Sequence, residues 1–155
     1  MLFNQPSKGM LVIKRFASLL VLLLLSSVSI ADTLKAESEL RPFAEKILQS
    51  VAKSDLDAAF SAMKPYVVIP DTEFQSVLLR TKAQREQYTS RYGRSVGYEF
   101  LGAKKLGQSL VRLTFIEKTE KTGLPWIFVF YETSEGWVLN SFFWSDQLPQ
   151  LFNSP

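Results

Sequence analysis

The sequence predicts an α+β domain in which amphipathic helices come first and an antiparallel sheet comes second. Between Leu40 and Arg80, apolar residues recur at the spacing of one helix face. After Gly93 the pattern changes to extended runs that are rich in aromatic and β-branched residues. Short turn sequences separate these runs, and short turns join antiparallel neighbours. The expected architecture is therefore a group of N-terminal helices packed on a four-stranded antiparallel meander.

Three helices are expected in the first part of this domain. The first covers residues 40–52, whose apolar positions lie along one face. The second begins at Asp55, a favourable N-cap residue, and stops before Pro65. The third begins after Pro70, where Thr72-x-x-Gln75 has the pattern of a capping box, and is expected to fade through Arg80–Gln87 because that stretch is polar.

Four strands are expected after the helices, joined by short turns. Gly107–Gln108 is typical of a tight turn, residues 119–123 of a longer loop, and Ser134–Gly136 of a three-residue hairpin loop. The strands between these turns are expected over residues 96–106, 109–118, 126–133 and 137–145.

The final hairpin is expected to have two apolar faces. With Ser134–Gly136 as its loop, Thr133 faces Trp137, and Asn140 lies among aromatic residues. The opposite face, which includes Trp137 and Leu139, is also apolar and needs a cover from a second subunit or from the sheet itself. The first face collects Trp126, Phe128, Phe130, Val138, Asn140, Phe142 and Trp144.

Residues 10–31 have the layout of a secretory signal peptide. Two basic residues precede an apolar run, small residues follow it, and cleavage is expected after Ala31. An uncleaved anchor is the alternative, but the run has about half of the roughly 20 apolar residues that a membrane-spanning helix needs. With Met10 as the expected start, residues 1–31 form the signal peptide and residues 32–155 a single exported domain, expected in the periplasm.

The composition excludes several classes of function. The signal peptide contains three of the 18 basic residues, so 15 remain against 15 acidic residues, and nucleic acid is not an expected partner. The chain has no cysteine and no histidine. This excludes disulfides, cysteine nucleophiles, serine–histidine catalysis and zinc bound through imidazole. We therefore assign no metal, no cofactor and no catalytic residue.

A basic run marks the end of the third expected helix and the loop that follows. One interpretation is a weak contact with anionic membrane headgroups or with an acidic partner. The alternative is an ordinary solvated helix face. The residues concerned are Arg80, Lys82, Arg85, Arg91 and Arg94.

The order of elements, together with three short patterns in the final hairpin, resembles the nuclear transport factor 2-like superfamily. The patterns are Trp126-x-Phe-x-Phe-Tyr131, Gly136-Trp137-x-Leu139 and Phe142-x-x-Ser145-Asp146. The resemblance extends from about Leu40 to Phe152. It implies a cone-shaped fold in which a curved sheet wraps the helices around a cavity, and it implies frequent dimerisation through the sheet.

This superfamily includes isomerases, dehydratases, polyketide cyclases and non-catalytic members, so the resemblance alone does not assign an activity. None of the tyrosines and carboxylates of the domain can be matched to the isomerase active site; those considered are Tyr88, Tyr92, Tyr98, Tyr131, Glu99, Glu117, Glu132 and Asp146. We expect a non-catalytic domain of the cell envelope that binds a small apolar or aromatic ligand or acts as an accessory protein, and that forms a homodimer. The expected cavity lining is Trp126, Phe128, Phe130, Asn140, Phe142 and Trp144, with Tyr92 and Tyr98 near the mouth.

Two alternatives remain open, and each predicts a different structure. A lyase or isomerase would need a carboxylate with a raised pKa beside a tyrosine hydroxyl in the cavity. A protein-docking module would have a filled cone and an exposed apolar patch.

Overall fold

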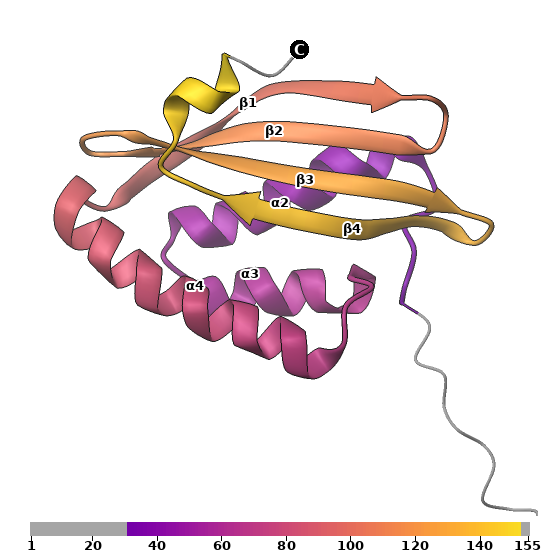
Figure 1. Ribbon diagram of the computed structural model, residues 1–155, viewed down its shortest axis with the longest axis horizontal. Coiled ribbons are helices and arrows are strands. Elements are labelled where there is room, and N and C mark those ends of the chain that lie inside the picture. Colours follow the sequence, from indigo (N-terminus) through magenta and orange to yellow (C-terminus); the bar gives the residue numbers. More distant parts are fainter. Residues whose placement is uncertain (1–30, 153–155) are drawn as a thin grey trace, which may run out of the picture. The chain divides into compact units, whose positions relative to one another are not determined.

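The computed structural model describes residues 31–152, in which three α-helices lie on one side of a four-stranded antiparallel sheet (Figure 1). The strands follow one another in the order β1-β2-β3-β4. The predicted α+β class and the meander are confirmed, whereas the predicted signal peptide lies outside the described residues except for Ala31. The elements are α2 (Leu40–Ala52), α3 (Leu56–Met63), α4 (Asp71–Tyr92), β1 (Ser95–Leu106), β2 (Leu110–Thr119), β3 (Gly123–Thr133) and β4 (Gly136–Trp144).

The starts of α3 and α4 agree with the sequence prediction, but the capping predicted for α4 does not. The Asp55 carboxylate accepts a hydrogen bond from the backbone N–H of Ala58 at 3.0 Å, as expected of an N-cap. Thr72 lies inside α4, whose N-cap residue is Pro70, and no side chain caps this helix. The predicted capping box is therefore wrong. The Thr72 carbonyl instead accepts a hydrogen bond from the Ser76 hydroxyl at 2.8 Å.

Helix α4 is longer than the sequence pattern indicates. It continues to Tyr92 through the polar stretch where it was expected to fade. Its buried residues occur at helical spacing, so Thr81 and Arg85 extend the buried face beyond the last apolar position. These buried residues are Phe74, Leu78, Thr81 and Arg85.

Strand β4 contains a bulge that changes the predicted hairpin register. As far as Val129 the pairing of β3 with β4 matches the prediction, but Phe130 then pairs with Leu139 instead of Asn140. Asn140 is the extra residue at the bulge and is exposed. Its expected position among the aromatic residues is wrong. Because a one-residue shift turns the side chains over, Trp137 and Leu139 are buried in the core.

The core fills the space between the helices and the inner face of the sheet with aromatic rings. The Phe60 ring lies edge-on to Phe142 with centroids 5.6 Å apart, and Trp126 stacks on Trp144 at 6.0 Å. Such pairs stabilise a core beyond the area that they bury. The largest fully buried aromatic side chains are Trp126, Phe60, Phe74, Phe115, Phe128 and Phe130.

The outer face of the sheet is less apolar than expected, because Trp137 and Leu139 belong to the core. Ile127 and Val129 are half-buried on this face, and Phe143 is 50% exposed. The C-terminal turn η4 (Leu148–Leu151) lies on the same side (Figure 1). Homodimerisation through this face stays a prediction.

The residues that follow the predicted cleavage site are part of the fold. Leu34 and Trp137 exchange two backbone hydrogen bonds, of 2.8 and 2.9 Å, along the free edge of β4. Val67 forms a parallel bridge to the same strand, and the N–H of Asp32 donates to the Pro65 carbonyl at 2.6 Å. These segments cover part of an edge that would otherwise expose unpaired backbone groups.

Replacing Phe128, which has no exposed surface, with alanine should lower the free energy of unfolding by about 3–5 kcal/mol, because it leaves a cavity in the core. The matched variant Phe143→Ala should change it by less than about 1 kcal/mol, since that ring is half exposed. Urea denaturation followed by tryptophan fluorescence measures both. Equal losses for the two variants would contradict the packing described above.

Candidate functional site

A buried ion pair connects α4 to the centre of the sheet. The Arg85 guanidinium donates to both carboxylate oxygens of Glu117 on β2, with Nη1–Oε2 at 2.7 Å and Nη2–Oε1 at 2.5 Å. The Glu117 side chain is fully buried, and the Arg85 side chain is 10% exposed. Paired, two-bond contacts of this kind are among the strongest hydrogen bonds in proteins and fix the orientation of both groups.

Two aromatic residues complete the surroundings of this pair. The indole N–H of Trp126 donates to Glu117 Oε2 at 2.9 Å, so one carboxylate oxygen accepts from two groups. The Arg85 guanidinium carbon lies 5.4 Å from the centre of the Trp144 ring, within the range of a cation–π contact. These contacts compensate for the loss of water around the two buried charges.

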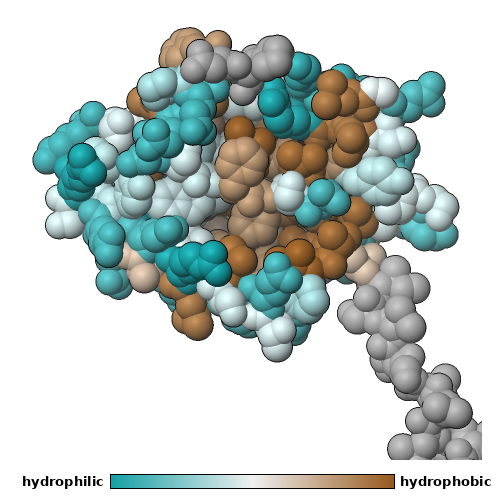
Figure 2. Space-filling model, in the orientation of Figure 1, coloured by the Kyte–Doolittle hydropathy of each residue, from teal (hydrophilic) through white to brown (hydrophobic). Residues whose placement is uncertain are grey.

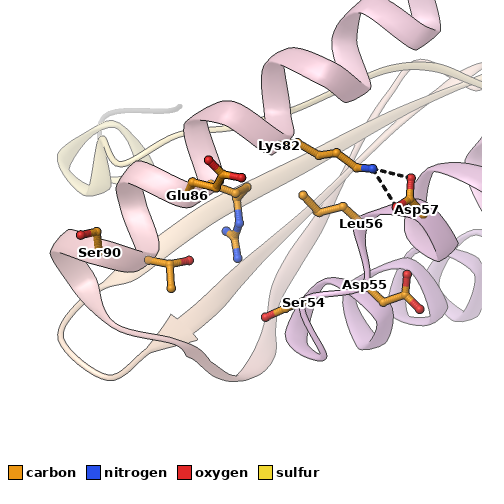
Figure 3. Close-up of a pocket in the computed structure, with 9 residues that line it drawn as sticks. Ser54, Asp55, Leu56, Asp57, Lys82, Glu86 and Ser90 are labelled. Carbon is orange, nitrogen blue, oxygen red and sulfur yellow. Dashed lines mark hydrogen bonds and ion pairs between the residues drawn. The ribbon is translucent and has the colours of Figure 1, made fainter.

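A cleft of about 600 Å³ lies beside Arg85, between α4 and the turn that joins α2 to α3 (Figure 3). It is open to solvent, and its volume is within the roughly 300–1,000 Å³ of small-molecule sites. The turn and the start of α3 contribute Ser54, Asp55, Leu56 and Asp57, and α4 contributes Lys82, Arg85, Glu86, Thr89 and Ser90.

The two walls of the cleft are joined by an ion pair at one end. Figure 3 shows Lys82 reaching from α4 to Asp57 on α3, with its ammonium nitrogen 2.7 Å from both carboxylate oxygens. Asp55 is already used as the N-cap of α3. Arg85 donates from both Nη atoms to Glu117, and it is also one of the residues that line the cleft.

The predicted cavity residues do not line this cleft. Trp126, Phe128 and Phe130 have no exposed surface and belong to the core. Tyr98 is half-buried and accepts a hydrogen bond from the Gln49 amide at 3.3 Å, and Tyr92 is half-buried with its ring centroid 5.6 Å from that of Tyr88. Their binding role stays a prediction.

The remaining predicted residues lie close to a smaller apolar hollow of about 120 Å³. Figure 2 shows apolar residues gathered in this hollow, between β4 and α4. Asn140 is at its rim, half-buried Phe142 lies in it, and half-buried Trp144 follows along the same strand. The lining is Val67, Ile69, Val77, Leu139, Asn140, Ser141 and Phe142.

The basic run does not form one solvated face. Arg85 is buried, which corrects its expected place in an exposed basic patch, because its partner Glu117 lies in the sheet. Lys82 is paired with Asp57, and Arg94 lies 3.7 Å from a Glu120 oxygen. Arg91 lies over the Tyr92 ring at 4.9 Å, and Arg80 is exposed. A contact of the exposed members with anionic lipid stays a prediction.

Tyr88 and Asp146 form a hydrogen-bonded pair near the C-terminal end of α4. The hydrogen bond from Gln147, with a further one from Tyr88, holds the pKa of Asp146 below its ordinary value. Burial and the bond to Asp146 raise the pKa of Tyr88. The pair therefore favours an ionised carboxylate beside a neutral phenol.

The sequence prediction missed the pair of Arg85 and Glu117, although the pattern contains a signal for it. Glu117 follows Val111, Leu113 and Phe115 at alternate positions of β2, all of which are buried. A carboxylate on the buried face of a strand needs a partner. Arg85 is the charged side chain at the matching position on the buried face of α4.

No model of a known protein family matches this chain, and no curated protein matches it either. Within residues 31–152, no helix is long and apolar enough to cross a membrane. The same residues contain no cluster of three or more acidic, histidine or cysteine side chains that could hold a metal ion.

Replacing Glu117 with glutamine should lower the free energy of unfolding by about 3–5 kcal/mol, because it leaves the Arg85 charge buried without a counterion. The double variant Arg85→Met/Glu117→Leu should recover much of this loss, since it removes both charges. Urea denaturation measures the three proteins. A double variant no more stable than Glu117→Gln would contradict this explanation.

Lowering the pH should remove stability as Asp146 is protonated, below its ordinary pKa of 3.8, because its folded pKa is depressed. Raising the pH above 10.0 should also remove stability, because the folded pKa of Tyr88 is raised and the unfolded state ionises first. Tyr88→Phe should flatten the alkaline flank of a plot of Tm against pH and should affect the acid flank less, because Gln147 still donates to Asp146. Tyr131→Phe, at an exposed tyrosine, should change neither flank. Identical profiles for wild type and Tyr88→Phe would contradict the pairing.

Proposed function

We propose that this domain is a non-catalytic small-ligand-binding protein of the cell envelope, with a cone-shaped fold of the nuclear transport factor 2-like type. The observation that carries the proposal is the cleft between α4 and the α2–α3 turn, whose inner wall includes a guanidinium held in place by a buried carboxylate. Binding sites are most effective when their polar groups are fixed before the ligand arrives.

The lining of the cleft favours a polar ligand over an apolar one. Apart from Leu56, every residue that lines it carries a charge or a hydroxyl group. The hydroxyl groups of Ser54, Thr89 and Ser90 both donate and accept hydrogen bonds, and the walls carry charges of both signs. We infer a small ligand with several hydrogen-bonding groups, bound in part through the guanidinium of Arg85.

An isomerase or lyase activity has less support. That reaction type needs a carboxylic acid with a raised pKa beside a tyrosine. The tyrosine–carboxylate pair formed by Tyr88 and Asp146 has the opposite arrangement, since the pKa of Asp146 is lowered. Glu117, the buried carboxylate of the core, is fully occupied by hydrogen bonds from Arg85 and Trp126.

A docking role is the second candidate, and the apolar hollow between β4 and α4 favours it (Figure 2). The core behind this hollow is filled by Phe60, Phe74 and Phe142, whose rings are in contact. A hollow of about 120 Å³ fits a single apolar side chain from another envelope protein rather than a whole ligand.

Native mass spectrometry of the protein purified from its own host tests the ligand proposal. The wild type should retain a bound small molecule, and Thr89→Trp should lose it, because an indole at this position fills the cleft. Gln87→Trp is the matched control, since Gln87 is also exposed on α4 but does not line the cleft. A wild-type protein without any adduct, or equal retention by both variants, would overturn the proposal and leave docking as the better candidate.

A further inference from the structure

The cleft between α4 and the α2–α3 turn contains charges of both signs, but its two cations already have partners. The ammonium group of Lys82 lies 2.7 Å from both carboxylate oxygens of Asp57. The guanidinium of Arg85 donates to both carboxylate oxygens of Glu117. A cation in contact with a carboxylate adds little to the potential of a site, because the field of its partner opposes its own. The potential in the cleft therefore depends on the carboxylates that remain.

Glu86 is a carboxylate of the cleft to which the fold gives no partner. Within residues 31–152, no hydrogen bond or ion pair joins its side chain to another residue. Lys82 lies one turn earlier on α4, at a spacing that allows pairing with Glu86, but it reaches across the cleft to Asp57 instead (Figure 3). Asp55, on the opposite wall, is the N-cap of α3, so the positive end of that helix offsets part of its charge. Glu86 is therefore the least compensated charge of the cleft.

The other polar groups of the cleft are hydroxyl groups. Ser90 lies one turn after Glu86 on α4, with Thr89 beside it, and Ser54 belongs to the turn on the opposite wall. Hydroxyl groups both donate and accept hydrogen bonds, so they suit hydroxyl groups of a ligand. The volume of about 600 Å³ fits a molecule rather than a bare ion. A metal ion is also a poor match, because residues 31–152 contain no group of three or more acidic, histidine or cysteine side chains that could hold one.

We propose that the ligand of this cleft is a small organic amine with hydroxyl groups, of the amino-sugar class, whose ammonium group binds Glu86. This inference rests on the proposed function, since it concerns the ligand of the same cleft. An ammonium group has three N–H donors and forms charge-assisted hydrogen bonds with a carboxylate. Because the guanidinium of Arg85 repels an ammonium group, the part of the ligand beside Arg85 is a neutral hydroxyl group. A neutral sugar of the same shape brings no counterion to Glu86 and binds more weakly.

Titrations with glucosamine and with glucose, followed through the backbone amide NMR signals of α4, test this inference. The two sugars differ at one ring position, where at about pH 6 glucosamine carries an ammonium group and glucose a hydroxyl group. Glucosamine should bind at least about tenfold more tightly than glucose. Glu86→Gln should remove this preference. The matched control Glu73→Gln, which changes an exposed carboxylate of the same helix outside the cleft, should keep it.

Equal binding of the two sugars, no binding of glucosamine, or an unchanged preference in Glu86→Gln would overturn this inference, as would a loss of the preference in Glu73→Gln. If Glu86→Gln fails to fold, the comparison of the two sugars on the wild type still decides the result. None of these outcomes overturns the proposed function, which is judged by the adduct that the wild type retains from its host and that Thr89→Trp loses. A wild type that has no adduct and also fails to bind glucosamine overturns both.

Discussion

The buried ion pair between Arg85 and Glu117 determines where α4 lies relative to the sheet. The N-terminal half of α4 packs through the apolar side chains Phe74 and Leu78, but its C-terminal half has Thr81 and Arg85 on the buried face. A polar helix face gains little from the hydrophobic effect, so the second half depends on directional contacts, of which the ion pair is the buried one. The Tyr88 ring adds an edge-on contact with Trp144 on β4, with centroids 5.1 Å apart. The ion pair also forms the inner wall of the cleft. A single interaction therefore connects the length of α4 with the geometry of the candidate site.

A buried ion pair is a poor source of stability, which makes its presence in this core informative. Removing two charges from water costs several kcal/mol per ion, and an apolar pair of the same size is often equally stable. An apolar pair in place of Arg85 and Glu117 would hold α4, but it would give the cleft no fixed donors. The pair is therefore better explained by a requirement of the site than by a requirement of the fold.

The sequence predicts most of the fold because its periodic patterns report directly on burial. The four strands, their order and the N-cap at Asp55 follow from local patterns and turn residues. The bulge at Asn140 could not be predicted, since the sequences on both sides fit either register and only packing of Trp137 and Leu139 against the helices decides between them. The length of α4 was underestimated for a related reason. A polar stretch remains helical when a partner distant in sequence compensates its buried charge.

The candidate site was beyond the sequence prediction because it depends on contacts between residues far apart in the chain. The prediction placed the ligand against the aromatic inner face of the sheet, but those rings pack on one another, and the open space lies on the far side of Arg85. The wall of the cleft depends on two residues from different elements, since Arg85 on α4 is held by Glu117 on β2. Each residue fits its own local pattern, and only the folded chain brings the two charges together, so no local pattern could predict the site that they form.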